Sequence, residues 1–242
     1  SNAKQRLRQT QVELAVLTKA NDSRSFYTTN LETMQTEEIT GNRISIHKQA
    51  KNFDLNTEQQ IAFTMYAIAI LERYCVRHEL NKNIVLRLRS VLGTNIDKTS
   101  NRLRLLMLGE GGTGKSHVIT CVRDFAERWD MADALVICAT TGGAASVING
   151  STWWSAMHCG PSTPDLSKVN IDNTNSWSPK GVLLCDELSM LGHEHLGKQN
   201  VRAQALKQSK DIMGGLHTSQ SGDFSQLPGV KQTALYRQPK NP

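Results

Sequence analysis

Residues 109–116 read GEGGTGKS, and they stand between an apolar run at 103–108 and a segment of helical periodicity that begins at Lys115. They match the phosphate-loop pattern G-x-x-x-x-G-K-[ST]. Glycines let backbone N–H groups turn toward phosphates, and the N-terminus of the following helix adds positive potential. The order strand, glycine turn, helix therefore predicts a site for nucleotide phosphates. The residues expected to form it are Gly109, Gly111, Gly112, Thr113, Gly114, Lys115 and Ser116.

A second apolar run, residues 182–185, ends in Asp186 and Glu187. An isolated Asp-Glu pair is usually just solvated, but a buried strand would fix both carboxylates beside the phosphate loop. We expect Ser116 and Asp186 to hold Mg²⁺, while Lys115 reaches the β- and γ-phosphates of a nucleoside triphosphate. Glu187 would then activate a water molecule as general base. The pattern predicts a triphosphate site built for hydrolysis.

The apolar runs at 103–108, 134–139 and 182–185 alternate with helical and polar segments. Such alternation predicts an α/β fold with a central, mainly parallel sheet flanked by helices, and function at the carboxyl ends of the strands. Residues 160–180 are predicted to be a loop from their composition. One face of the helix after the phosphate loop is expected to carry Val118, Val122, Phe125 and Trp129.

The N-terminal part of the chain is predicted to be helical and linker-like. Residues 1–3, Ser-Asn-Ala, are interpreted as the remnant of a removed tag. Residues 4–20 space apolar side chains loosely on one helical face, and residues 21–54 are polar without a strong period. A long apolar helix is predicted up to about residue 80, with Asn56 or Thr57 as its N-cap.

Composition adds weaker constraints. The formal net charge is +6 at pH 7, which suits a polyanionic partner, although the basic residues are spread along the chain. No run approaches the roughly 20 apolar residues that a membrane span needs. The five cysteines are scattered, which favours reduced, buried thiols of an intracellular protein over disulfides or a metal site. His193 and His195 are expected in a surface loop rather than in a zinc site.

Four further stretches narrow the class of protein. Residues 55–59 read LNTEQ, residues 140–145 read TTGGAA, residues 186–190 read DELSM and residues 222–228 read GDFSQLP. In this order around the phosphate loop they resemble the Q, Ia, Walker B and III motifs of superfamily 1B DNA helicases of the PIF (petite integration frequency) and RecD-like type. The stretches GEGGTGKS and TTGGAAS are similar to the same motifs in helicases encoded by Helitron-like transposons. The resemblance extends from about residue 55 to 235.

This resemblance implies a RecA-like P-loop NTPase domain over residues 55–242, the first motor domain of a helicase, preceded by a basic helical and linker segment at 4–54. It implies ATP hydrolysis coupled to 5′→3′ translocation on single-stranded DNA. The family works in DNA repair, DNA recombination and telomere maintenance, and its transposon members in transposition. We expect a monomer that is intracellular, in the nucleus or mitochondrion if the chain is eukaryotic.

The resemblance also assigns roles to single residues. Gln59 would read adenine, and Gln226 would sense the γ-phosphate and relay its presence to DNA. The small residues of motif Ia would let backbone N–H groups bind nucleic-acid phosphates, although close helix packing would also explain them. Of two neighbouring tryptophans, we expect one to stack on a base. The expected nucleic-acid contacts are Thr141, Gly142, Trp153, Trp154 and Ser155.

The sequence departs from the family pattern in three places. Residues 217–221 read HTSQS where the family has a buried apolar strand, so this segment would be an edge strand, irregular, or the product of drift. Gly229 replaces the second proline of motif III. No second motor domain or arginine motif precedes Pro242, so we expect this chain alone to hydrolyse ATP slowly and not to unwind DNA. The alternative is a truncated or drifted module that binds nucleotide or nucleic acid without useful turnover.

Overall fold

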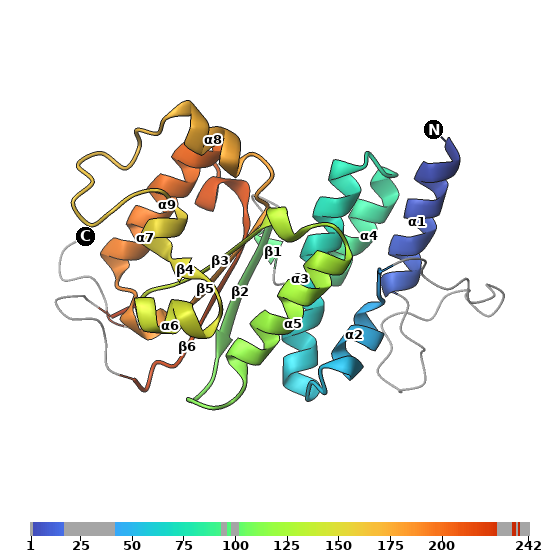
Figure 1. Cartoon of the computed structure of the whole chain (residues 1–242), viewed down its shortest axis with the longest axis horizontal. Helices are drawn as coiled ribbons and strands as arrows, with labels where there is room; N and C mark the ends of the chain where they lie inside the picture. Colours follow the sequence, from blue (N-terminus) through green and yellow to red (C-terminus); the bar gives the residue numbers. More distant parts are fainter. Residues whose placement is uncertain are drawn as a thin grey trace.

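The computed structural model describes residues 2–16, 42–92, 96–97, 102–226, 234–235 and 237. The described residues form one sheet in the order β1-β2-β6-β5-β3-β4 (Figure 1). β1 runs antiparallel to β2, and all other pairings are parallel. The strands are β1 (Ile96–Asp97), β2 (Arg102–Leu108), β3 (Leu135–Ala139), β4 (Ser151–Thr152), β5 (Val182–Asp186) and β6 (His217–Gly222). The three predicted strands and the predicted α/β fold class are confirmed.

Helices cover both faces of the sheet (Figure 1). On one face, α3 and α5 bury Phe63 and Phe125 edge to face against the strands. On the other, α7, α8 and α9 form a second core around Trp153 and Trp177. The α-helices are α1 (Asn2–Val16), α2 (Ile46–Asn52), α3 (Thr57–Arg77), α4 (Lys82–Leu92), α5 (Lys115–Arg128), α6 (Gly142–Val147), α7 (Trp153–Ala156), α8 (Ile171–Trp177) and α9 (His193–Lys207). The described residues also form the short 3₁₀ helices η2 (Ala132–Ala134), η3 (Leu188–Met190) and η4 (Ile212–Gly215).

The predicted N-cap of the long helix is confirmed at Asn56. Its side chain accepts a hydrogen bond from the Gln59 backbone N–H, and the Gln59 side chain accepts one from the Asn56 N–H, both at 3.0 Å. This reciprocal arrangement satisfies two of the N–H groups that a helix start leaves open. The helix ends at Arg77, slightly before the expected residue 80. Of the expected helix at 4–20, residues 17–20 lie outside the described residues, as do residues 21–41 of the expected linker.

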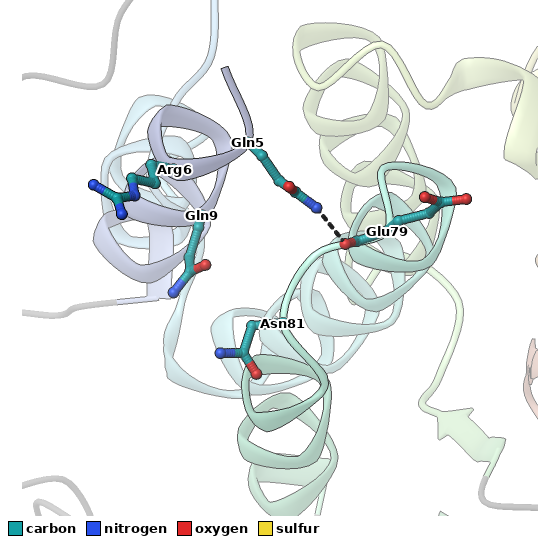
Figure 2. A pocket seen from close by; sticks show the side chains of 5 residues that line it. All are labelled: Gln5, Arg6, Gln9, Glu79 and Asn81. Atoms are coloured by element: carbon teal, nitrogen blue, oxygen red, sulfur yellow. Dashed lines mark hydrogen bonds between the residues drawn. The ribbon is translucent and has the colours of Figure 1, made fainter. Parts of the chain in front are cut away.

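The N-terminal helix is tied to the rest of the fold at the turn between α3 and α4. There the Gln5 side-chain amide donates to the Glu79 carbonyl at 2.7 Å (Figure 2). A shallow polar hollow lies at this junction, lined by Gln5, Arg6, Gln9, Glu79 and Asn81. α1 and α2 pack beside α3, the helix whose start contacts residues 109–116 through Gln59.

Two predictions for the second half of the chain are wrong. Residues 171–177 form α8 inside the segment predicted to be a loop, because Asn170 caps the helix by accepting from the Asn173 N–H at 2.8 Å. Trp177 then anchors this polar helix in the core, where it is 2% exposed. His193 and His195 lie in the first turn of α9, not in a loop.

The polar segment at 217–221 is a central strand, so the expectation of an edge strand or an irregular segment is wrong. β6 lies between β2 and β5 and pairs with both in parallel. Its side chains alternate between the two faces of the sheet. His217 and Ser219 face α3, while Gln220 donates to Gln199 of α9 at 3.4 Å.

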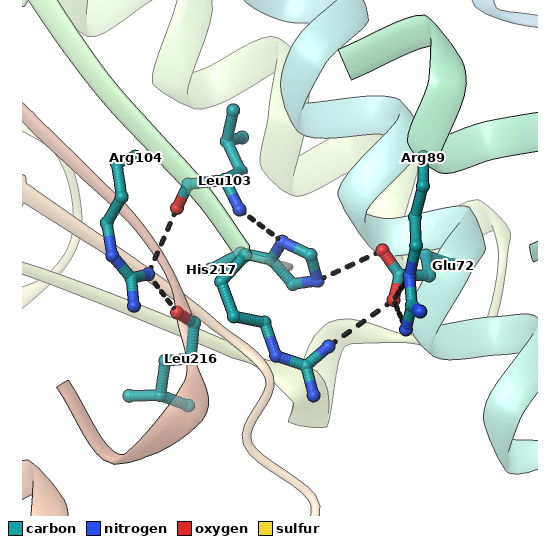
Figure 3. Close-up of polar contacts among 7 residues, drawn as sticks. Glu72, Arg89, Leu103, Arg104, Leu216 and His217 are labelled. Carbon is teal, nitrogen blue, oxygen red and sulfur yellow. Dashed lines mark hydrogen bonds and ion pairs between the residues drawn. The ribbon is translucent and has the colours of Figure 1, made fainter. Parts of the chain in front are cut away.

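Buried partners explain how this strand tolerates its polar side chains. The Ser219 and Tyr66 hydroxyls are 2.5 Å apart, and Arg104 Nη1 donates to the Thr218 hydroxyl at 3.4 Å. His217 Nδ1 accepts from the Leu103 backbone N–H at 3.1 Å (Figure 3). Since buried polar groups cost free energy chiefly when they lack a partner, the strand is compatible with the core.

A buried ionic cluster lies between α3 and the start of β6. Glu72 of α3 is fully buried, and its Oε1 accepts from Arg89 Nη2 at 2.8 Å and from Arg102 Nη1 at 3.3 Å (Figure 3). Its Oε2 lies 3.4 Å from His217 Nε2. Burial, and then the surrounding arginines, lower the pKa of His217 well below its usual value. The imidazole is therefore neutral, and its Nε2–H faces the Glu72 carboxylate.

Replacing Tyr66 with phenylalanine is expected to lower the free energy of unfolding by about 1–2 kcal/mol, because the buried Ser219 hydroxyl loses its partner. The measurement is urea unfolding followed by circular dichroism. The matched control is Tyr74→Phe on the same helix, since no described residue hydrogen-bonds the Tyr74 hydroxyl. The control should leave stability unchanged or raise it. Equal losses in both variants would contradict the assignment.

Candidate functional site

The carboxyl ends of the parallel strands bring the sequence motifs to one edge of the sheet. The phosphate loop follows β2, Asp186 ends β5, and Thr140 follows β3. Backbone hydrogen bonds join these ends directly. The Gly109 N–H donates to the Gly222 carbonyl at the end of β6, and the Thr140 N–H donates to the Asp186 carbonyl, both at 3.2 Å. In the sheet, β6 lies between β2 and β5, so motif III begins between the strand that leads to the phosphate loop and the Walker B strand.

The phosphate loop turns on glycines in the left-handed backbone region. Gly112 and Gly114 both have φ of +84°, a conformation that glycine adopts without steric cost. A Cβ built on Gly114 would lie 2.4 Å from Gln59 Nε2, so the side-chain amide of Gln59 lies against this turn. In this conformation Lys115 Nζ donates to the carbonyls of Gly109 at 2.7 Å and Glu110 at 2.9 Å. The ammonium group thus already lies within the loop that would hold phosphate.

Gln59 joins the long helix to the phosphate loop. Its side-chain amide donates to the Thr113 carbonyl at 3.1 Å, across 54 residues of sequence. The start of α3 is therefore fixed beside the loop, where a nucleotide base could approach it. The adenine-reading role of Gln59 remains a prediction.

Asp186 and Ser116 present oxygen atoms to a common point. Asp186 is 6% exposed, and its Oδ2 accepts from the Ser116 hydroxyl at 3.4 Å. Its Oδ1 accepts from the Ser221 hydroxyl at 2.6 Å and from the Glu187 N–H at 2.9 Å. Mg²⁺ prefers oxygen ligands, which carboxylate and hydroxyl groups supply. The residues present therefore fit a magnesium ion between the phosphate loop and β5.

Glu187 has a strained backbone conformation. Its φ of +64° lies in the left-handed region, which non-glycine residues adopt much less often than glycine. Two hydroxyls fix it there: Thr140 Oγ1 donates to its carbonyl at 2.9 Å, and Ser189 Oγ donates to its Oε1 at 3.0 Å. The carboxylate follows the Walker B strand with a defined orientation, as a general base requires.

Gln226 lies in the turn after β6 and is exposed. A Cβ built on Gly111 would be 3.9 Å from Gln226 Nε2, so this amide is next to the phosphate loop. Asp223 shapes the turn by accepting from the Ser225 N–H at 2.9 Å. The hydrogen bonds from Ser225, and the nearby Lys115, lower the pKa of Asp223. The structure thus brings Gln226 to the loop, while its sensing role stays a prediction.

The five predicted nucleic-acid contacts differ in accessibility. Gly142 and Ser155 are exposed, and the Thr141 hydroxyl caps α6 by accepting from the Ala144 N–H at 3.2 Å. Trp154 is half-buried and stacks on Trp153, with ring centroids 3.6 Å apart. Trp153 is only 1% exposed. Its ring packs in the core, so Trp154 is the one of the pair that has surface for the expected stacking on a base, and this contact stays a prediction.

Three expectations about absent features concern the described part of the chain only. There, all five cysteines are unpaired and four are buried, as expected for reduced thiols. Within the same residues, no three potential ligands among His, Cys, Asp and Glu gather into a metal-binding group. None of the described helices combines the length and the apolar character that crossing a membrane requires.

Sequence reasoning missed the hydroxyls that support the two acidic residues. Ser221 contacts Asp186, whereas Thr140 and Ser189 contact Glu187. The one available signal was the polar character of residues 217–221, since a central strand needs a reason to carry serine. In the structure these side chains have buried partners, which neither an edge strand nor an irregular segment would require.

Comparison with known proteins gives one consistent family. The family model described as PIF1-like helicase matches residues 80–240, about two thirds of the chain. The ATP-dependent DNA helicase RRM3 of Saccharomyces cerevisiae is 33% identical over 136 residues, which is 53% of this chain and 19% of RRM3. The ATP-dependent DNA helicase Pif1 of Bdellovibrio bacteriovorus is 30% identical over 141 residues, 53% of this chain and 30% of that protein.

Among solved structures, the Pif1 helicase from Candida albicans has a TM-score of 0.49 and 27% identity, covering 60% of this chain and 32% of that one. The matched region is thus no more than about a third of each of these three proteins. The family assignment depends on the sequence match, which includes the phosphate loop, the Walker B strand and motif III. On that match, the chain belongs to the PIF1-like helicase family.

Proposed function

We propose that this chain binds Mg·ATP and hydrolyses it as part of an ATP-dependent DNA helicase that moves 5′→3′ along single-stranded DNA. One observation carries the proposal: Lys115, Asp186 and Glu187 lie at the same edge of the sheet, although 71 residues separate the lysine from Asp186. The relatives reported above carry the name ATP-dependent DNA helicase. We extend that activity to this chain as one part of a larger motor.

The side chains divide the work of hydrolysis between them. Lys115 exchanges its contacts with the Gly109 and Glu110 carbonyls for phosphate oxygens, and the loop N–H groups bind the remaining negative charge. Ser116 and Asp186 would hold Mg²⁺, which supplies positive charge at the phosphate oxygens. Glu187 accepts a proton from the attacking water. Gln226, beside Gly111, is close enough to the loop to respond to the γ-phosphate.

Direct hydrogen bonds connect the proposed DNA side of the site with the backbone of Asp186 and of the proposed general base, Glu187. Thr140 precedes Thr141, which begins the proposed phosphate-binding segment for DNA. The same Thr140 donates through its N–H to Asp186 and through its hydroxyl to the Glu187 carbonyl. A shift of this segment on binding DNA would therefore move the backbone of the general base. We propose this link as the route by which single-stranded DNA stimulates hydrolysis.

The rival proposal, a drifted binding module without turnover, loses part of its support. Its first motive was the polar segment at 217–221, which proves to be an ordered central strand with partners on both faces. The matched region is only 19% of RRM3 and 30% of the Bdellovibrio protein. For these 242 residues by themselves we therefore propose slow hydrolysis without unwinding. Roles in repair, recombination or telomere maintenance, and the intracellular location, are proposals of the same kind.

Steady-state ATP hydrolysis by the chain, with and without single-stranded DNA, tests the proposal. We expect a slow rate that single-stranded DNA raises several-fold and that double-stranded DNA of equal length raises less. Lys115→Ala protein prepared in the same way shows how much activity comes from contaminating enzymes. A rate that does not respond to DNA, or that survives the loss of Lys115, would favour the binding module instead.

A further inference from the structure

Ser221 contacts the proposed metal site from a strand that the family pattern expects to be apolar. It is the fifth residue of β6 and is 3% exposed. Its hydroxyl donates to Asp186 Oδ1 at 2.6 Å. This distance is in the range of a hydroxyl donating to a charged carboxylate, which is among the stronger hydrogen bonds in proteins.

The two oxygens of Asp186 have different surroundings because of this contact. Oδ1 receives two donors, the Ser221 hydroxyl and the Glu187 N–H. Oδ2 receives only the longer contact from the Ser116 hydroxyl. Rotation of a carboxylate about its terminal bond is otherwise soft. The hydrogen bond from Ser221 therefore selects the orientation in which Oδ2 faces the phosphate loop.

We propose that Ser221 is a positioning residue of the magnesium site: its hydroxyl holds Asp186 with one oxygen free to face the metal. The inference rests on the proposed binding of Mg·ATP and names a residue that the motifs do not include. It also explains why β6 carries a polar side chain at its last position before Gly222. An apolar residue at this position could not donate, and Asp186 Oδ1 would keep the Glu187 N–H alone.

The neighbouring Ser219 provides a matched control. It lies on the same strand and the same face, is 2% exposed, and also uses its hydroxyl in a buried hydrogen bond. Its partner, however, is Tyr66 of α3 rather than a carboxylate of the site. Loss of either hydroxyl removes one buried hydrogen bond, but only the loss at Ser221 should change how the protein binds the metal.

The experiment measures the dissociation constant of a fluorescent ADP analogue in excess Mg²⁺ and again in EDTA. The ratio of the two constants reports the contribution of the metal, independently of turnover. Residues that orient a metal ligand typically contribute 10–100-fold to metal affinity. For Ser221→Ala we expect the ratio to shrink about tenfold, with an unchanged constant in EDTA. Ser221→Thr, which keeps the hydroxyl, should recover most of the ratio, and Ser219→Ala should keep the wild-type ratio.

Two outcomes would overturn the inference, and they are distinguishable. Mg²⁺-dependent binding that is the same in Ser221→Ala as in the wild type would exclude the positioning role and leave the proposed function intact. A wild-type chain that binds no nucleotide in either buffer would exclude the proposed function and this inference with it. If Ser221→Ala does not fold, Ser221→Cys carries the same prediction, because a thiol is a weak donor.

Discussion

Replacing Glu187 with glutamine is expected to lower the rate of ATP hydrolysis about 10²–10⁴-fold and to leave nucleotide binding close to that of the wild type. The amide keeps the size of the side chain and can still accept from the Ser189 hydroxyl. It cannot take a proton from water at neutral pH. The backbone of residue 187 should also stay in place, since Thr140 holds its carbonyl.

Single-turnover hydrolysis of radiolabelled ATP, together with fluorescent nucleotide binding, separates these two effects. The matched control is Glu194→Gln in the first turn of α9, where an exposed carboxylate pairs with Lys198 on the surface. The control should hydrolyse ATP at the wild-type rate. A Glu187→Gln variant with normal turnover would show that another group activates the water. Loss of binding would show instead that Glu187 supports the nucleotide.

The parts of the site that the sequence predicted are those with local causes. The phosphate loop needs glycine at two positive φ angles, and Gly112 and Gly114 supply them within a few residues of Lys115. Likewise the capping box of Asn56 and Gln59 is complete within four residues. Such features appear in the sequence as fixed spacings. Their structure is therefore predictable before any tertiary contact is known.

The parts that the sequence did not predict depend on partners far along the chain. The polar strand β6 can lie in the centre of the sheet because its side chains have buried partners. One of them, Tyr66, is 153 residues away from Ser219 in sequence but forms a hydrogen bond with it in the fold. No local sequence pattern predicts a partner at such a distance along the chain. Trp153 and Trp154 show the same limit of sequence-based prediction. They are neighbours of the same residue type, yet Trp153 is fully buried and Trp154 is half-buried. α8 is not predictable from the sequence because its seven residues are mostly polar and show no helical period. Only the burial of Trp177 in the fold anchors them.

Glu72 shows how much stability such a distant contact can contribute, and its replacement by alanine is expected to lower the free energy of unfolding by about 3 kcal/mol. Breaking a buried ion pair by removing one partner typically costs 3–5 kcal/mol. The lower end applies because Arg89 and Arg102 are 28% and 22% exposed, so water can partly solvate them. His217 is fully buried and would keep an Nε2–H without its facing carboxylate.

Thermal and urea unfolding of Glu72→Ala measure this loss, and Asp133→Ala is its matched control. Asp133 also accepts from an arginine of α3, with Arg77 Nη2 at 2.9 Å, but its side chain is 53% exposed. Exposed ion pairs contribute about 0–1 kcal/mol, so the control should unfold within that margin of the wild type. Both variants remove a carboxylate that binds arginine, but Glu72 is fully buried and contacts Arg89, Arg102 and His217, whereas Asp133 is half-exposed and pairs with Arg77. Similar small losses in the two would mean that water enters the cluster at the start of β6, and that backbone pairing and the Tyr66–Ser219 hydrogen bond hold β6 in place instead.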